Sequence, residues 1–378
     1  MRDARDEKRS DGGDASGTAD PLARLDPKTL ADAPVSPDVP AFETRLTDRL
    51  GIDAPVVQAP IGSATCPELA AAVSETGGLG TLAVTWRDPA DAADAVRRTR
   101  DLTDCPFGVN LVVDPAATEY PTEDHVEACL DAGAPVFSFS FGDATRHVER
   151  VDDAGATTLW TVGSAAEARD AVDAGADVVV AQGWEAGGHV QSEVATMPLV
   201  PRVADAVPDT PVVAAGGIAD GRGLAAAATL GADGVWVGTR FLATEEANVH
   251  RAYRRRVVEA AETETRYGTP FSKGWPGTPH RVLRNETTDR WEAAARPESD
   301  RPGDGETVAR GPDGPVGRYE DSLATPEMEG DVTELPLYAG QSAGLTDDVV
   351  PAGDVVDAFV SEAATALRAA DGRVRTDR

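Results

Sequence analysis

Eight short apolar runs, separated by segments with helix signals, restrict most strongly what this chain can fold into. Each run has the unbroken apolar character of a parallel strand that is covered on both faces. The runs lie at Val56–Ala59, Leu79–Val84, Phe107–Val112, Val136–Phe141, Thr157–Val162, Val178–Ala181, Val212–Ala215 and Val235–Val237. Strands that alternate with helices in this way are typical of α/β folds with a parallel sheet.

Helix signals fill the gaps between the runs. The pairs Thr65–Glu68 and Ser164–Glu167 have capping-box spacing, and Asp88–Pro89 marks a third helix start. Eight strands with their helices in about 190 residues match a (β/α)8 TIM barrel more economically than a doubly wound sheet. A Rossmann fold is the second choice. It is disfavoured because no run opens into GxGxxG with an acidic residue about twenty positions further on.

The chain divides by composition into four parts. Residues 1–40 are polar, acidic and without periodicity, so we expect a disordered acidic extension. Residues 41–265 carry the eight runs and are expected to form the barrel. Residues 266–337 are rich in Gly, Pro and charge, which indicates a small inserted lid subdomain. Residues 338–378 are expected to complete the site and to end in a helix that packs on the barrel.

The insert and the closing helix contain further signals. Phe271 and Trp275 are candidates to cover the site, and Gly303–Gly317 is expected to be flexible, although a plain surface excursion is an equal alternative for this second half. The closing helix should dock through one apolar face. This face comprises Val355, Val356, Phe359, Val360, Ala363 and Leu367.

The sixth run opens into a glycine-rich loop that carries one histidine. In alternating β/α folds ligands bind at the carboxyl ends of strands, so Gln182, Gly187 and His189 are expected to line a site. The paired glycines let the backbone approach a ligand closely. His189 can exchange protons near neutral pH, and the alternative is a histidine that only bonds within the loop. Glu185 either orients this loop or is a solvated carboxylate.

The seventh and eighth runs end in glycine as well. Gly216-Gly217 follows the seventh run, and Gly238-Thr239 follows the eighth. Barrels commonly bind phosphate with these two loops, because their free backbone N–H groups converge on an anion. A tight strand-to-helix turn is the alternative for either motif alone. Together they indicate a phosphorylated ligand.

The charge balance excludes several classes of partner. The net charge is -30, so a nucleic acid or an anionic membrane surface would be repelled. Lysine occurs only at Lys8, Lys28 and Lys273. A large excess of Asp and Glu with so little Lys indicates a halophilic source, where salt screens the self-repulsion.

The remaining composition points to a reducing, cytoplasmic location. Cys66, Cys105 and Cys129 are odd in number and form no CxxC pair, which fits neither a disulfide framework nor a zinc site. No apolar stretch is long enough to span a bilayer, and the N-terminus lacks the apolar core of a signal peptide. The other four histidines show no metal-ligand spacing and are expected in helical or loop surfaces, so no metal is expected. They are His125, His147, His250 and His280.

Several motifs together resemble the nitronate monooxygenase family, formerly called 2-nitropropane dioxygenases. They are QAPIG (58–62), FGVN (107–110), AQGWEAGGH (181–189), PVVAAGGIADGRGLAAA (211–227), GADGVWVGTRF (231–241) and YAGQSAGL (338–345). The resemblance covers about residues 42–265 and the last forty. It implies an FMN-dependent TIM barrel that oxidises alkyl nitronates with dioxygen, giving a carbonyl compound and nitrite.

The resemblance also implies roles for individual residues. His189 would be the catalytic histidine, facing the substrate near the flavin. Asn110 and Gln182 would contact the flavin ring, and Gly217 with the end of the eighth strand would hold the phosphate. The full set of implied FMN contacts is Asn110, Gln182, Gly187, Gly217, Trp236, Val237, Gly238, Thr239 and Gln341. The sequence departs from the family pattern just after the histidine, at residues 190–193. This difference affects the expected identity of the substrate more than the expected binding of flavin.

Two other functions stay open. One is an NAD(P)H-dependent FMN reductase that acts on a quinone or an enoyl-thioester, and the other is a non-redox barrel that binds a sugar phosphate. A barrel of the inosine-monophosphate dehydrogenase type is disfavoured, because no cysteine lies in the loop after the sixth run. The expected partners are a small-molecule substrate and dioxygen. Whether the chain forms a homodimer is left open.

Overall fold

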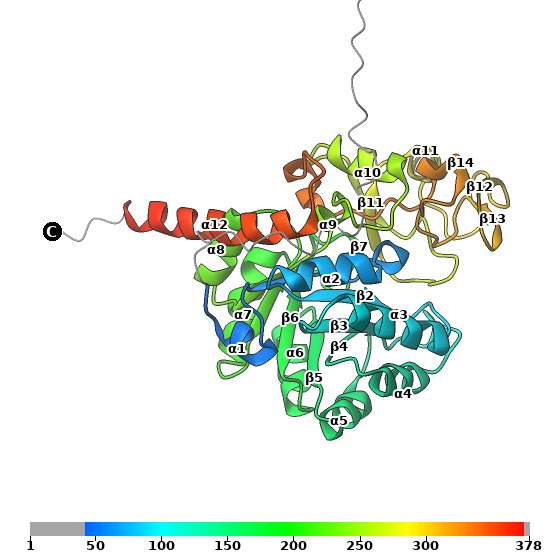
Figure 1. The fold of residues 1–378 in the computed structure, drawn as a ribbon. Coiled ribbons are helices and arrows are strands. Elements are labelled where there is room, and N and C mark those ends of the chain that lie inside the picture. The colour runs from blue at the N-terminus through cyan, green and yellow to red at the C-terminus, as the bar shows by residue number, and fades with distance from the viewer. Residues whose placement is uncertain (1–41, 374–378) are drawn as a thin grey trace, which may run out of the picture. The chain divides into compact units, whose positions relative to one another are not determined.

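The computed structural model of the protein describes residues 42–373, so the extension expected at 1–40 lies outside the described residues. Eight parallel strands form the central sheet in the order β1-β9-β8-β6-β5-β4-β3-β2, and a parallel bridge from Val57 to Leu79 joins the two end strands. The sheet is thus closed into the predicted TIM barrel (Figure 1). Its strands are β1 (Val56–Gln58), β2 (Gly80–Ala83), β3 (Phe107–Val112), β4 (Val136–Ser140), β5 (Thr157–Val162), β6 (Val178–Gln182), β8 (Val212–Ala215) and β9 (Gly234–Val237).

Each predicted apolar run coincides with one of these strands to within one residue at either end. The runs were recognisable because barrel strands are covered inside by other strands and outside by helices, so nearly every position is buried. The surrounding helices are α2 (Pro67–Glu75), α3 (Pro89–Leu102), α4 (Thr122–Ala132), α5 (Thr145–Asp153), α6 (Ala165–Asp173), α7 (Thr196–Ala206), α8 (Gly221–Thr229), α9 (Thr239–Leu242) and α10 (Arg251–Val258).

Two of the three predicted helix starts are confirmed. The side chain of Ser164 accepts a hydrogen bond from the backbone N–H of Glu167, and Asp88 caps α3 ahead of its first-turn proline. The prediction for Thr65 is wrong, because α2 begins after Cys66. The Thr65 hydroxyl instead accepts from the N–H of Ala83 at 3.0 Å. A tertiary hydrogen bond to β2 therefore replaces the helix cap that the local sequence pattern predicted.

A short helix closes the amino-terminal end of the barrel. Leu46 and Leu50 of α1 (Arg45–Leu50) pack with inward-facing residues near the strand starts, such as Val136 and Val178. Arg45 also forms an ion pair of 2.7 Å with Asp233, just before β9. Because this end is filled, a ligand can reach the barrel axis only from the carboxyl ends of the strands.

The insert forms two small sheets at the carboxyl end of the barrel (Figure 1). The first has the order β10-β11-β7 and joins β10 (Thr265–Gly268) and β11 (His280–Leu283) to β7 (Gly188–His189) from the loop after β6. The second has the order β13-β12-β14 and consists of β12 (Thr307–Gly311), β13 (Gly314–Gly317) and β14 (Glu329–Gly330). Helix α11 (Glu286–Ala293) and the short 3-10 helix η3 (Val332–Glu334) complete this region.

The stretch Gly303–Gly317, expected to be flexible, contains the paired strands β12 and β13 instead. Buried Arg318 fixes the end of this hairpin, because its guanidinium donates to Glu306 at 2.9 Å and also pairs with Glu334. The Gly and Pro residues of this stretch therefore mark turns next to paired strands, not a flexible segment.

The C-terminal helix docks as expected. Helix α12 (Ala352–Asp371) lies along α8 (Figure 1), and all but the last of the six predicted face residues are buried, Leu367 being packed at the margin. The Glu362 carboxylate accepts from the N–H of Gly221 at 3.0 Å, which ties α12 to the start of α8. In the described part of the chain, no helix is long and apolar enough to cross a membrane.

Candidate functional site

A cavity of about 610 Å³ opens at the carboxyl ends of the barrel strands. The loops after β1, β6, β8 and β9 form its inner walls, and the insert forms its outer wall. A volume of this size suits a small-molecule ligand or cofactor. Of the ten residues predicted for the site, eight line the cavity: Asn110, Gln182, Gly187, His189, Gly217, Trp236, Gly238 and Thr239.

The other two predicted residues lie close to the cavity but do not line it. Val237 is fully buried in β9. Gln341 begins the 3-10 helix η4 (Gln341–Leu345), and its backbone N–H donates to the carbonyl of Glu185 at 3.0 Å, while its neighbours Gly340 and Ser342 line the cavity. The contribution of Gln341 is therefore to hold the segment that forms the wall.

The loop after β6 is held in place by its own polar groups. The Gln182 amide accepts from the N–H of Gln191 at 2.8 Å and donates to the carbonyl of His189 at 3.2 Å. The Glu185 carboxylate accepts from the N–H and hydroxyl of Thr196 at 2.8 and 3.0 Å. Of the two interpretations of Glu185, the structure supports the one in which it orients the loop.

Gly187 permits a close approach between two parts of the wall. A Cβ at this position would lie 2.4 Å from the nitrogen of Gly340 and 2.5 Å from the carbonyl carbon of Ala339. A side chain here would force the backbone of residues 339–340 to shift. The absence of a side chain at residue 187 thus lets segment 338–342 pack directly on the loop that carries His189.

The His189 imidazole is almost fully buried at the cavity wall. Its ring packs against Trp275 with a centroid distance of 4.2 Å and an interplanar angle of 32°, and its Nε2 atom has no hydrogen-bond partner among the described residues. Burial, with a smaller effect of nearby His280, lowers the pKa of His189 well below 6.5. The imidazole is therefore neutral at physiological pH and can act as a proton acceptor.

His280 lies opposite His189 in the antiparallel pairing of β11 with β7. Its Nε2 accepts from the N–H of Phe271 at 3.1 Å, and burial lowers its pKa to about 4. The expectation that the remaining histidines lie on the surface is wrong for three of them. His125, His147 and His280 are all buried.

Two residues near His189 were missed by the sequence analysis. The Asp321 carboxylate lies 3.6 Å from His189 Nε2, measured from Oδ2, and its Oδ1 accepts a hydrogen bond of 2.5 Å from the Tyr338 hydroxyl. Burial raises the pKa of Asp321 to about 6, although the Tyr338 hydrogen bond opposes this shift. Tyr338 belongs to the YAGQSAGL motif, whereas nothing in the local sequence around Asp321 singles it out.

The glycine loops after β8 and β9 form a cradle of free backbone donors. Gly216 and Gly217 have positive φ values of 98° and 74°, which an L-residue rarely adopts. Within residues 42–373, the N–H groups of Gly216, Gly217 and Gly238 have no hydrogen-bond acceptor. The Thr239 hydroxyl accepts from Gly340 N–H at 2.9 Å, so segment 338–342 also braces this side. Such a set of donors suits a phosphate.

Charged side chains in the cavity wall are acidic. The lining includes Asp313, Asp321 and Glu327, and neither Lys nor Arg occurs among the described lining residues. In the described part of the chain, no group of three or more His, Cys, Asp or Glu side chains is arranged to hold a metal ion.

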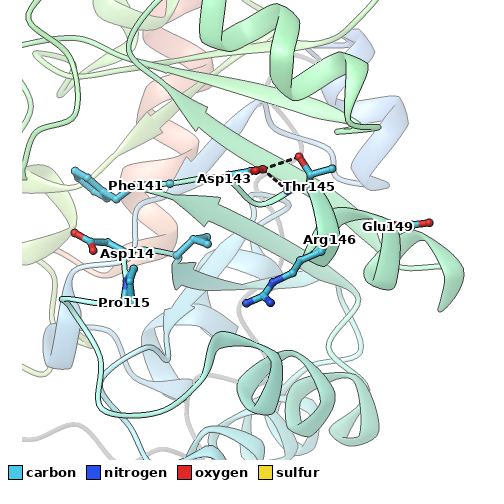
Figure 2. Close-up of a pocket in the computed structure, with 9 residues that line it drawn as sticks. Asp114, Pro115, Phe141, Asp143, Thr145, Arg146 and Glu149 are labelled. Atoms are coloured by element: carbon cyan, nitrogen blue, oxygen red, sulfur yellow. Dashed lines mark hydrogen bonds between the residues drawn. The ribbon is translucent and has the colours of Figure 1, made fainter.

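A second, more open hollow of about 550 Å³ lies beside the cavity. Figure 2 shows its lining side chains, among them Asp114, Phe141 and Arg146, near the ends of the neighbouring strands β3 and β4. Phe141 and Trp275 separate it from His189, since Phe141 meets Trp275 edge-on at 4.7 Å and Asp114 accepts from the Trp275 indole N–H at 2.9 Å. Trp275, predicted as a cover, is thus a fixed wall of the cavity.

The sequence matches a described family over most of its length. Residues 43–362 match the family described as nitronate monooxygenase. A Mycobacterium tuberculosis protein named a 5-hydroxy-7a-methyl-1-oxo-octahydro-1H-indene-4-carboxyl-CoA dehydrogenase is 34% identical, with 88% of this chain and 99% of that protein covered. A Staphylococcus saprophyticus protein named probable nitronate monooxygenase is also 34% identical, with 65% of this chain and 79% of that protein covered.

Solved structures of similar sequence share the fold. FabK from Thermotoga maritima superposes with a TM-score of 0.72 at 33% identity, covering 88% of this chain and 99% of that chain. Nitroalkane oxidase from Streptomyces ansochromogenes superposes with a TM-score of 0.68 at 31% identity, covering 86% and 99%.

Proposed function

Because this chain belongs to the nitronate monooxygenase family, a family of oxidoreductases, we propose that it is an FMN-dependent enzyme that oxidises alkyl nitronates and nitroalkanes with dioxygen. The products would be a carbonyl compound and nitrite. The observation that carries the proposal is the position of His189, whose neutral imidazole lies in the wall of the same cavity as the phosphate-type cradle.

The residues present fit FMN. Free N–H groups at Gly217 and Gly238 suit its terminal phosphate, and the cavity volume of about 610 Å³ suits its ring with a small substrate. Asn110 and Gln182 would contact the flavin ring, and Trp236 would add an apolar contact to FMN. When bound, FMN supplies the redox chemistry, taking electrons from the substrate and delivering them to dioxygen.

The chain's own residues supply proton transfer and positioning. A nitroalkane loses its α-proton on oxidation, and the neutral His189 imidazole is suited to accept it. A nitronate arrives without that proton, so its oxidation would require no proton transfer to His189. Trp275, which is buried behind the imidazole, keeps the ring in one orientation and excludes water from that side.

The test is a direct assay with the purified protein. We expect yellow protein that releases FMN rather than FAD on denaturation, because the cradle suits one terminal phosphate and the chain has no Rossmann glycine motif for a pyrophosphate. We also expect dioxygen uptake and nitrite release with a short nitroalkane and with its nitronate. Colourless protein that cannot be reconstituted with FMN would favour the non-redox barrel.

A second candidate is redox chemistry on an acyl-thioester. It is favoured because the Mycobacterium tuberculosis relative, which aligns over 99% of its length, is named for a carboxyl-CoA substrate. FMN-loaded protein that releases no nitrite but oxidises or reduces a cyclic acyl-CoA, with NAD(P)H as reductant in the second case, would establish this alternative. Activity with a quinone and NAD(P)H would establish the reductase function.

A further inference from the structure

We propose that Asp321 is a positioning residue for His189, which orients the imidazole and balances the positive charge that His189 gains with the substrate's proton. The inference rests on the proposed function for the identity of the substrate. It deepens that function by bringing the insert into the proton transfer, since Asp321 lies in residues 266–337.

The geometry places one carboxylate oxygen against the enclosed face of the imidazole. Asp321 Oδ2 lies 3.6 Å from His189 Nε2, and the two side chains retain only 12% and 8% of their exposure. Nε2 has no other partner in residues 42–373, although a buried ring nitrogen normally has one. The distance is slightly longer than a hydrogen bond, as is common for catalytic contacts without a bound substrate.

The opposite side of Asp321 is firmly held. Oδ1 accepts from the Tyr338 hydroxyl at 2.5 Å, and the Tyr338 carbonyl accepts from the buried Tyr253 hydroxyl at 2.6 Å. The Asp321 N–H donates to the carbonyl of Lys273 at 2.9 Å. One oxygen is thus fixed by Tyr338, and the other remains available to His189.

No other group near the pair can take this role. His280 faces His189 but is neutral, since its pKa is lowered to about 4 and its Nε2 already accepts from Phe271. Asp114 is on the far side of Trp275, where it accepts from the indole. Asp313 and Glu327 line the same cavity, but neither forms an ion pair with His189.

The proton balance follows from this arrangement. The C–H bond of the substrate breaks, the proton passes to Nδ1 of His189, and the electron pair remains on the substrate, delocalised into its nitro group. The imidazole must then carry its first proton on Nε2, directed at Asp321 Oδ2. The carboxylate stays ionised throughout and stabilises the imidazolium.

Because burial raises the pKa of Asp321 to about 6, the carboxylate is present above that pH and is lost as the pH falls through it. His189 remains neutral over the same range, since its own pKa is lowered. The decrease of kcat at low pH, the acid limb of its pH profile, should therefore have its midpoint near pH 6 and report the protonation of Asp321.

The decisive experiment compares kcat profiles of FMN-loaded variants. Asp321→Asn should lower kcat about 10²-fold and abolish the limb near pH 6, while Asp321→Glu should restore the limb and part of kcat. Asp300→Asn, which removes an exposed carboxylate from the same insert, is the control and should resemble the wild type. An Asp321→Asn variant that keeps both kcat and the limb would overturn the proposal.

Tyr338→Phe separates positioning of His189 from simple anchoring. The Tyr338 hydrogen bond lowers the pKa of Asp321, so its loss should move the acid limb to higher pH and leave the plateau of kcat within a few-fold. If Asp321 served only to anchor Tyr338, both variants would show the same loss and the limb would remain in both.

A spectroscopic measurement decides the question without turnover. The chain has five histidines, so nuclear magnetic resonance of isotope-labelled histidine, with His189→Asn for assignment, can identify the His189 signals. We expect the tautomer protonated at Nε2, with shifts that follow Asp321 on both sides of pH 6, and loss of this response in Asp321→Asn. Identical His189 signals in both proteins would overturn the proposal, whereas absent nitro activity with the expected signals would overturn only the proposed function.

Discussion

His189 is the side chain on which the proposed chemistry depends most. We expect His189→Asn to lower kcat about 10²- to 10⁴-fold, because Asn keeps a hydrogen bond but cannot exchange a proton at neutral pH. FMN should stay bound, since Gly217 and Gly238 of the cradle belong to other loops. Steady-state turnover and the flavin absorbance per protein after gel filtration check both statements.

His250→Asn is the matched control for this change. His250 caps α10 by accepting from the N–H of Ala252, and Asn is a favoured residue at such a position. Near-normal turnover in His189→Asn would remove His189 from the mechanism. If His189→Asn lost only its flavin, the loop after β6 would serve to bind the cofactor, and another residue would have to be the proton acceptor.

Single residues were predictable where their own loop carried the signal. His189 follows an apolar run and two glycines, so its place at a strand end could be inferred from the sequence. Asp321 follows no such run, and only the packing of the insert brings it to His189. Three histidines were expected on the surface, but their apolar surroundings come from distant segments, which a local pattern does not include.

At the level of elements, two glycines of the cavity wall should behave differently. Gly187→Ala should lower the free energy of unfolding by about 1–3 kcal/mol, because its Cβ would clash with the backbone of segment 338–342. Gly238→Ala should change it by less than about 0.5 kcal/mol, since the nearest atom, Ala59 Cβ, is 3.6 Å away. The methyl group would instead occupy the cradle.

Denaturant unfolding without flavin and titration with FMN distinguish the two effects. For Gly238→Ala we expect FMN affinity to fall at least about tenfold, which corresponds to 1.4 kcal/mol of lost phosphate binding. Wild-type affinity in this variant would show that the phosphate binds elsewhere. Wild-type stability in Gly187→Ala would mean that segment 338–342 can move away from the loop.

The elements themselves were predictable to different degrees. Barrel strands are apolar on both faces, so each leaves a run in the sequence. The two-residue strand β7 leaves none, because it exists only through its pairing with β11. The insert strands are short and rich in Gly, Pro and Arg, and their hairpin is stabilised by tertiary ion pairs such as that of Arg318 with Glu306.

For the whole molecule, the net charge of -30 should make stability depend on salt. At about 0.01 M salt the Debye length is roughly 30 Å, so acidic groups repel one another across the surface, whereas at about 1 M it is roughly 3 Å. We expect Tm and activity to rise as KCl increases over this range. Thermal unfolding at several KCl concentrations, with the flavin content held constant, is the measurement.

Sucrose at matched viscosity serves as the control for nonspecific solvent effects. Many of the ion pairs are exposed and contribute little, so their screening should not offset the relief of repulsion. Full stability and activity in dilute buffer would contradict the halophilic interpretation.

The two small sheets of the insert region contribute to different parts of the cavity: one holds His189, and the other forms part of the mouth. Because β7 is a strand of the β10-β11-β7 sheet, the insert cannot swing away as an independent lid without carrying His189 with it. The other sheet bears Pro312, Asp313, Glu327 and Met328 at the cavity mouth. The turn between β12 and β13 can therefore change, and with it the cavity mouth, while the pairing that holds His189 beside β11 stays intact.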